Sequence, residues 1–338
     1  MNHREYELIE ADIKSRCLAE LLPQTRIHPL RSFSTPFASV FVKREDDSGF
    51  GISGCKRRKY ASLIYFLLEK NIHKIALAGG SHSNHLPGIL QILREKGIKP
   101  HIFVKEAHEA ALNGNRLLLD LLTQPDELTW LSSRLWPEVE KIAGKWVVEQ
   151  GTSAFFIPEG GSCEPALPGA LTLMLDILRN EAEAGVTFDH IFIDSGTGLM
   201  AAALVMMNHL LGRKTQIHVV LIAGDTDYFS RILKETQTWT HTLTGITLGK
   251  VVEPEYHIPL TGRSFGSVNA TILNETRRLA LEEGLLTDPV YTTKLFMTAR
   301  ETIQKKSFQG TALVVHSGGG TGLMGWGNRF SQKYSYDQ

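Results

Sequence analysis

The 338-residue sequence predicts an α/β fold of mainly parallel, twisted sheets with helices on both faces. Short apolar runs, typical of buried strands, alternate with longer stretches whose apolar residues recur at helical spacing. Loops rich in glycine and hydroxyl residues follow several of the runs, at the point where parallel sheets bind ligands. Alternation of this kind indicates βαβ units.

The individual elements follow from these patterns. We expect strands at seven apolar runs: Ser39–Val42, Ile75–Ala78, His101–Val104, Ala154–Ile157, His190–Ile193, Ile217–Ile222 and Ala312–Val315. Helical patterns cover Leu86–Lys96, Gly114–Leu122, Ala166–Glu183 and Met200–Leu211. The Asp126–Gly144 region is harder to interpret, and its tryptophans and leucines fit a helix that begins after Pro125.

Two glycine-bearing segments, Gly49–Gly54 and Glu159–Gly169, fit crossings between two α/β domains. They divide the chain into a larger domain, residues 1–54 plus 160–338, and a smaller one, residues 55–159. A chain of this length is long enough to bury two cores.

Composition and charge exclude several classes of protein. Lys plus Arg and Asp plus Glu each number 36, so the formal net charge is zero, which gives no support for nucleic-acid or membrane binding. Cys17, Cys55 and Cys163 form neither a CxxC pair nor an even set, which argues against disulfides and structural zinc. No signal peptide or apolar membrane span is visible. We therefore expect a soluble, cytoplasmic protein that acts on a small molecule.

Lys56 follows a glycine turn and starts a helical pattern, in the run of four cations Lys56–Lys59. Cations are disfavoured at a helix N-terminus, because the helix dipole there favours anions. One explanation is that the dipole and the neighbouring cations favour the neutral amine of Lys56, which could then condense with an aldehyde. The alternative, favoured by the cluster alone, is a solvated basic patch on a surface helix.

Two glycine-rich loops suit anionic ligands. Asp194–Ala201 fits a phosphate, because its glycines let the backbone approach and a helix N-terminus follows. It also reads G-x-G-x-x-A with Asp225 after the next strand, so a dinucleotide-dependent oxidoreductase is a rival interpretation. Gly79–His85 suits a carboxylate or phosphate, or is a polar helix cap. Since no carboxylate or cysteine stands near His82 and His85, we expect no metal.

Two further loops are open to more than one interpretation. Tyr291, in Asp288–Lys294, is either an acid/base group or a packed ring at the start of a helix. The glycine-rich segment His316–Gly322 directly follows a predicted strand. It fits a close ligand or chain contact, or a flexible turn.

Taken in order, these segments resemble the pyridoxal-phosphate enzymes of the D-cysteine desulfhydrase and 1-aminocyclopropane-1-carboxylate deaminase family. The resemblance extends from about Pro29 to Gly325. The motifs that carry it are Val42–Asp46, Gly54–Lys59, Gly79–Gly80 with Ser83–Asn84, Glu159–Ser162, Asp288–Tyr291 and His316–Gly319. Their order and spacing reverse the preference for a surface patch at Lys56.

The resemblance implies a tryptophan-synthase-β-like fold, a homodimer, and a pyridoxal 5'-phosphate site in the cleft between two domains. Lys56 would bind the cofactor and later act as the base at the substrate Cα, and Ser83 and Tyr291 would be the other catalytic groups. The remaining implied site residues fall into two sets. Cofactor contacts would come from Asn84, Ser195, Gly196, Thr197, Gly198, Leu199, Thr292 and Ser317, and the substrate carboxylate would be held by Ser83, Asn84 and His85.

Thr292 helps to choose between the two activities. Deaminase-type members place a Glu directly after the matching Tyr, whereas desulfhydrase-type members place a Thr, as here. A hydroxyl stabilises a protonated pyridine less than a carboxylate does, so the cofactor is a weaker electron sink. This favours β-elimination from a D-cysteine-like amino acid, giving pyruvate, ammonia and sulfide. The alternative within the family is 1-aminocyclopropane-1-carboxylate deaminase.

Three residues depart from the family pattern. Cys55 replaces an Asn before the lysine, Met200 replaces a Thr of the phosphate loop, and Phe265 replaces a common Tyr. Loss of one hydroxyl ligand would weaken cofactor binding by roughly 1–3 kcal/mol. A protein that binds the cofactor without catalysis is therefore a further alternative.

Overall fold

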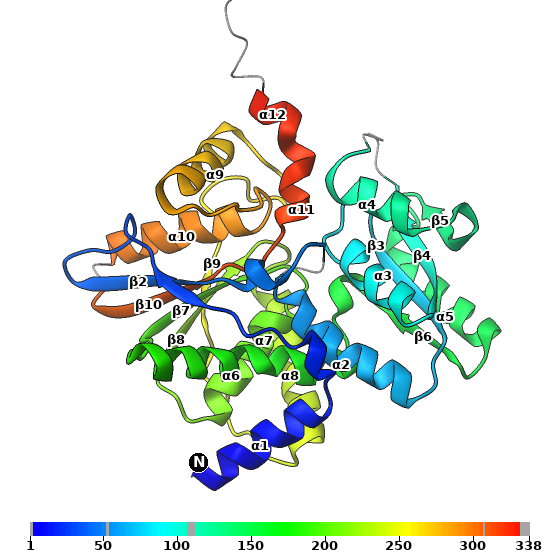
Figure 1. Ribbon diagram of the computed structural model, residues 1–338, viewed down its shortest axis with the longest axis horizontal. Coiled ribbons are helices and arrows are strands. Elements are labelled where there is room, and N and C mark those ends of the chain that lie inside the picture. The colour runs from blue at the N-terminus through cyan, green and yellow to red at the C-terminus, as the bar shows by residue number, and fades with distance from the viewer. Residues whose placement is uncertain (1–2, 52–53, 107–111, 307, 332–338) are drawn as a thin grey trace, which may run out of the picture.

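The computed structural model describes residues 3–51, 54–106, 112–306 and 308–331 (Figure 1). These residues form two sheets, and helices cover both faces of each, which confirms the predicted α/β class. Among them no helix combines the length and the apolar character needed to cross a membrane. Residues 52–53 of the first predicted domain crossing lie outside the described residues.

The larger sheet has six strands in the order β1-β2-β10-β7-β8-β9. Only the β1–β2 pair is antiparallel among the described strands. The strands are β1 (Ile27–Pro29), β2 (Ala38–Lys43), β7 (His190–Ser195), β8 (Gln216–Leu221), β9 (Glu255–His257) and β10 (Gly310–Val315).

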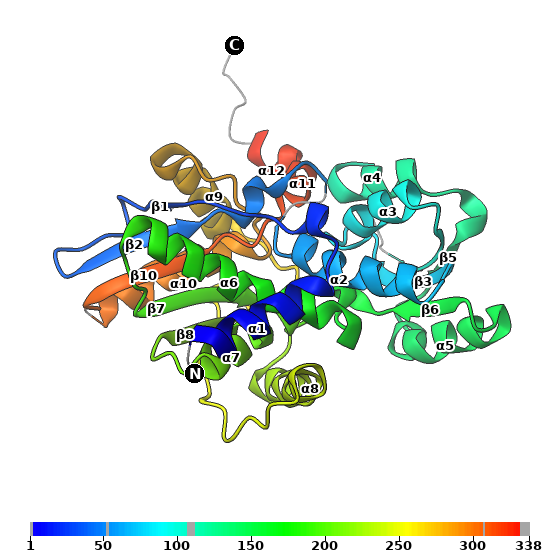
Figure 2. The same cartoon turned by 60° about the horizontal axis from the view of Figure 1, so that its bottom comes forward.

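Helices cover both faces of this sheet (Figures 1 and 2). One face packs against α9 (Ala270–Glu283) and α10 (Thr292–Lys305). The other packs against α6 (Leu167–Ala184), α7 (Leu199–Leu210) and α8 (Thr226–Thr244). Additional helices are α1 (His3–Ser15), which contacts α6, and α11 (Gly320–Leu323) and α12 (Gly327–Ser331) near the described C-terminal end.

The smaller sheet has four parallel strands in the order β5-β4-β3-β6. They are β3 (Lys74–Gly80), β4 (Lys99–Lys105), β5 (Leu128–Leu131) and β6 (Ala154–Ile157). Helices α3 (Leu86–Glu95) and α4 (Gly114–Leu122) pack on one face, and α5 (Val139–Gln150) packs on the other. Helix α2 (Lys56–Glu69) lies between the two sheets and packs against α6 and α3 (Figure 1).

All seven predicted strands are present, and each begins and ends within two residues of its predicted ends. The helix predicted after Pro125 is wrong. Leu128–Leu131 is instead strand β5, which pairs in parallel with β4, and the helix begins only at Val139. Pairing with β4 satisfies the backbone of this short segment, and that tertiary contact overrides the helical pattern.

A buried ion network holds the start of α2 in place. Arg58 is 1% exposed, and its guanidinium donates to both Glu45 carboxylate oxygens at 2.7 Å and to Asp176 at 2.7 Å. Lys43 donates to Asp176 from the end of β2. The network therefore ties α2 to β2 and α6 by charge-assisted hydrogen bonds.

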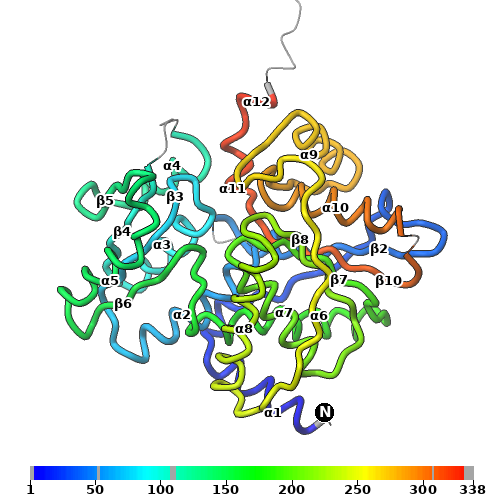
Figure 3. Tube along the Cα trace, turned by 180° about the vertical axis from the view of Figure 1, so that it is seen from behind, coloured from blue at the N-terminus to red at the C-terminus, as the bar shows by residue number. Residues whose placement is uncertain are grey.

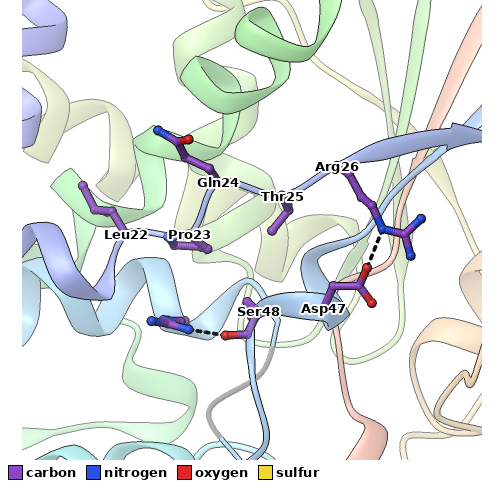
Figure 4. A pocket seen from close by; sticks show the side chains of 8 residues that line it. Leu22, Pro23, Gln24, Thr25, Arg26, Asp47 and Ser48 are labelled. Atoms are coloured by element: carbon purple, nitrogen blue, oxygen red, sulfur yellow. Dashed lines mark hydrogen bonds and ion pairs between the residues drawn. The ribbon is translucent and has the colours of Figure 1, made fainter.

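A surface pocket of about 430 Å³ lies beside this network (Figure 4). Arg26 and Asp47, which both line it, form an ion pair with 2.8 Å between Nε and Oδ2. Arg57 also lines the pocket and donates to the Ser48 carbonyl. The pocket is lined by Leu22, Pro23, Gln24, Thr25, Arg26, Asp47, Ser48 and Arg57, and none of these is a predicted site residue.

Helices α2 and α6 touch at Gly169. A Cβ at this position would lie 1.8 Å from the Arg58 carbonyl oxygen, so Gly169→Ala must push the two helices apart. We expect a loss of about 1–3 kcal/mol in the free energy of unfolding, measured in urea.

The matched control is Gly144→Ala, at a helical position in α5 where a new Cβ has no neighbour within 4 Å. It is expected to raise the free energy of unfolding by about 0.5–1 kcal/mol. A Gly169→Ala protein as stable as the wild type would show that this close approach is not a constraint.

Candidate active site

Lys56 stands apart from the three cations that follow it. Arg57 donates to main-chain carbonyls, Arg58 is buried in the ion network, and Lys59 is buried with its amine donating to the Gly160 carbonyl. Among the described residues, the Lys56 side chain makes no hydrogen bond or ion pair, and its Nζ lies 6.0 Å from the centre of the Tyr291 ring. The run of cations is therefore not a solvated surface patch.

The turn before Lys56 rests on the loop after β10. Gly54 has φ +82°, and a Cβ there would lie 2.0 Å from the Ser317 carbonyl oxygen. The Cys55 N–H donates to the same oxygen at 3.1 Å, and the Cys55 side chain is buried. Only glycine fits both the positive φ and the close approach. The structure thus brings Ser317 next to the lysine turn.

Tyr291 packs over the glycines of the loop after β7. A Cβ on Gly196 would lie 3.0 Å from Cε1 of Tyr291, and the Phe265 ring meets the Tyr291 ring edge-on at 5.8 Å. Burial, followed by the charges of Asp288 and Asp194, raises the pKa of Tyr291 above its ordinary value. The phenol is therefore protonated at neutral pH and available as a proton donor.

The loop from β7 to α7 has the features of an anion site. Gly198 has φ +91° and lies at the start of α7, whose first N–H groups have no helical partner. Ser195 Oγ and Asp194 Oδ1 are buried without a hydrogen-bond partner among the described residues. Unpaired buried polar atoms cost about 1–3 kcal/mol each, so a polar ligand here would stabilise the protein. Ser195, Gly196, Thr197, Gly198 and Leu199 thus line one continuous loop.

The loop after β3 is held by α2 and α4. The Tyr60 hydroxyl lies 2.9 Å from His85 Nδ1, and Asn84 Oδ1 accepts a hydrogen bond from Asn115. The Ser83 hydroxyl accepts from the His85 N–H at 3.0 Å. Burial, followed by the charges of Lys59 and Lys56, lowers the pKa of His85 well below its ordinary value, and its Nε2 is unpaired among the described residues. This loop therefore presents neutral polar groups.

Thr292 is fully buried, but its hydroxyl already has a partner. It accepts a hydrogen bond from the Asp288 N–H at 2.7 Å. The Asp288 carboxylate accepts from the Val290 and Tyr291 N–H groups at 2.8 and 2.7 Å. Burial raises the pKa of Asp288 to about 6. The predicted role of Thr292 as partner of the cofactor ring stays a prediction.

Three site residues were missed by sequence reasoning: Lys59, Asp194 and Asp288. Burial, followed by the charge of Lys56, lowers the pKa of Lys59 to about 7, which makes it a second amine able to react as a nucleophile. Burial raises the pKa of Asp194. The signal of the two carboxyls in the sequence is weak, because Asp194 lies near the end of a strand and Asp288 lies at a loop position that ordinarily serves as a helix cap.

A dinucleotide site at the loop after β7 would need an acidic side chain that binds the ribose, and Asp225 does not serve as one in this structure. Asp225 caps α8 instead, with its carboxylate accepting the Tyr228 N–H at 2.8 Å. A carboxylate used in this way satisfies an N–H at the helix start and is not directed at a ribose.

Comparison with known proteins identifies the class. Residues 18–318 match the family described as pyridoxal-phosphate dependent enzymes, and the chain belongs to this family. It is 26% identical over 291 residues to a Pyrococcus abyssi protein provisionally named 1-aminocyclopropane-1-carboxylate deaminase, covering 85% of this chain and 86% of that protein. The predicted family resemblance and the predicted pyridoxal 5'-phosphate cofactor are confirmed.

Solved structures show the same fold. The crystal structure of an ACC deaminase homologue superposes with a TM-score of 0.86, at 24% identity, over 98% of this chain and 99% of that one. A threonine deaminase from T.th. superposes with a TM-score of 0.66, at 16% identity, over 92% and 97% of the two chains. The protein is thus a pyridoxal-phosphate-dependent enzyme that shares its fold with these structures.

The observed groups fit this cofactor. The unpaired Ser195 hydroxyl and the free N–H groups of the α7 start suit a phosphate, and Lys56 suits an aldehyde. Pyridoxal phosphate, when bound, withdraws electrons from the substrate Cα and so makes its proton acidic. The protein's part is to place a base at that proton, to bind the substrate carboxylate, and to exclude water.

Proposed function

We propose that the protein eliminates the Cβ substituent from a small amino acid, with D-cysteine as the model substrate. D-cysteine and one water would give pyruvate, ammonia and hydrogen sulfide. The proposal rests on the buried Thr292 directly after Tyr291, because the family resemblance implies that this position partners the cofactor ring, where a carboxylate would make a stronger electron sink. Elimination depends less on electron withdrawal by the cofactor, because the thiol leaving group takes the electron pair.

The site residues take distinct parts in this proposal. Lys56, with its free amine facing Tyr291, removes the Cα proton. Tyr291, protonated at neutral pH, donates a proton to the departing sulfur. The polar groups of Ser83, Asn84 and His85 bind the substrate carboxylate. Two further sets hold the cofactor: the loop Ser195–Leu199 for the phosphate, and Asn84, Thr292 and Ser317 for the ring.

A second candidate is 1-aminocyclopropane-1-carboxylate deaminase, favoured by the name of the Pyrococcus abyssi relative. Its reaction opens a ring that has no leaving group and releases 2-oxobutyrate. The test incubates the holo-protein separately with D-cysteine, L-cysteine and 1-aminocyclopropane-1-carboxylate, and measures sulfide, pyruvate and 2-oxobutyrate. Sulfide and pyruvate in equal amounts from D-cysteine support the proposal. Release of 2-oxobutyrate without sulfide establishes the deaminase instead, and no product from any of the three refutes both.

We also propose that the larger domain comprises residues 1–54 and 160–338 and the smaller one residues 55–159, with the active site between them. Loops from both sheets support this proposal, because the loop after β3 and those after β7 and β10 converge near Lys56. A cytoplasmic homodimer is part of the same proposal. Sedimentation equilibrium of the holo-protein at twice the chain mass of 37.6 kDa would support it, and a monomer would refute it.

A further inference from the structure

Three histidines line up across adjacent strands of the larger sheet, outside the loops assigned to the cofactor. His218 Nε2 lies 3.1 Å from His190 Nδ1, and His218 Nδ1 lies 3.0 Å from His257 Nε2. Glu255 lies directly opposite His218 in the β8–β9 register, two residues before His257 on the same face. Its carboxylate oxygens are 3.5 Å from His218 Nδ1 and 3.6 Å from His257 Nε2.

We propose that His218, Glu255 and His257 bind a divalent transition-metal ion of the zinc type at the β8–β9 edge of the sheet. Two ligands that are each about 2.05 Å from a tetrahedral ion lie about 3.3 Å apart. The two ring nitrogens lie 3.0 Å apart, and each lies 3.5 or 3.6 Å from one of the two Glu255 carboxylate oxygens, so all three separations are near this value. Two imidazoles and a carboxylate form a donor set suited to zinc, with water at the fourth position.

The surroundings already orient the ligands. His218 is 1% exposed and stacks on Phe192 at 4.2 Å, and His190 stacks on Phe308 at 4.2 Å. When His218 Nε2 donates to His190 Nδ1, the lone pair on His218 Nδ1 is directed at Glu255 and His257. A hydrogen bond on the far ring nitrogen is the usual way in which a metal-binding histidine is fixed.

Access comes from the sheet edge. β9 is the last strand of the larger sheet, and Figure 3 shows the yellow segment between α8 and α9, which carries it, running along β8. The Glu255 side chain is 35% exposed, whereas His257 is 11% exposed. By register His218 lies opposite Phe192, and His257 lies level with Asp194 but two strands away, about 10 Å across the sheet. The proposed ligands therefore lie outside the loop that is assigned to the cofactor phosphate.

Lys306 is the one described cation that forms an ion pair with Glu255, and it competes with a metal for that carboxylate. Its side chain is 50% exposed, so it can turn into solvent when an ion binds. Removing this lysine should therefore tighten metal binding, an effect that damage to the fold would not produce.

The test is a calorimetric titration of the untagged holo-protein with Zn²⁺, after treatment with a chelator. We expect one ion per chain, weakened at least about 100-fold by His257→Gln and tightened about two- to fivefold by Lys306→Gln. His73→Gln, an exposed histidine in the turn between α2 and β3, is the matched control and should bind as the wild type does. Wild-type binding weaker than about 100 μM, or equal binding by wild type and His257→Gln, would overturn the proposal.

Discussion

Replacing Lys56 with alanine is expected to lower turnover of the holo-protein by about 10³-fold or more. The variant loses the one amine at the site that the described residues leave unbonded, and with it the proposed base at the substrate Cα. It should also lose the visible absorption band that pyridoxal phosphate gives when bound to a lysine. Absorption spectra and the rate of keto-acid release measure both effects.

The matched control is Lys70→Ala, an exposed lysine at the other end of the same helix, which should keep the band and the activity. Circular dichroism and urea unfolding check that Lys56→Ala folds. Because the Lys56 side chain makes no hydrogen bond or ion pair with the described residues, its loss should leave stability nearly unchanged. A folded Lys56→Ala protein with wild-type turnover would refute the mechanism.

The largest stability effect is expected for Arg58→Met. The arginine pairs with Glu45 and Asp176 in the protein interior, so its removal leaves buried carboxylates without their main partner. Breaking a buried ion pair from one side costs about 3–5 kcal/mol. Urea unfolding should show this loss. Glu45→Met combined with Arg58→Met should recover part of it, because no unpaired Glu45 carboxylate then remains; a double variant less stable than Arg58→Met would contradict this explanation.

The same network predicts how stability depends on pH. Burial alone would raise the pKa of Asp176, but the charges of Arg58 and Lys43 outweigh burial and hold it well below its ordinary value. A carboxyl with a lowered folded-state pKa stabilises the protein above its unfolded pKa of about 3.9, and this contribution is lost as the pH falls further. Wild-type stability should therefore begin to fall below about pH 5 and keep falling as the pH approaches the low folded-state pKa, and Arg58→Met should show a shallower fall. Equal slopes would show that Arg58 does not set this dependence.

The central strands of the fold were predictable from the sequence for a clear reason. A parallel strand buried on both faces, such as β3 or β7, is a continuous apolar run. β1, β5 and β9 were missed because each is only three or four residues long, lies at the edge of a sheet, and lacks the continuous apolar run that marks the equally short edge strand β6. A local sequence pattern holds no information on the pairing that forms these strands.

The candidate site was predictable where it depends on backbone chemistry. The glycines of the loops after β7 and β10 marked ligand loops because a helix start and a positive φ need them. The cations after Lys56 could not be interpreted alone, since the partners of Arg58 and Lys59 come from distant segments, at Glu45, Asp176 and Gly160. The cluster of His218, Glu255 and His257 could not be predicted either, because the pairing register of β8 and β9 brings these residues together.

Two amines, on Lys56 and Lys59, lie one helical turn apart, and the lowered pKa of Lys59 makes it the natural competitor for the cofactor. The most direct test of the account reduces the holo-protein with borohydride and maps the lysine that retains the phosphopyridoxyl group by mass spectrometry of its peptides. We expect the group on Lys56. Finding it on Lys59 or another lysine, or on none, would contradict the assignment on which the proposed reaction depends.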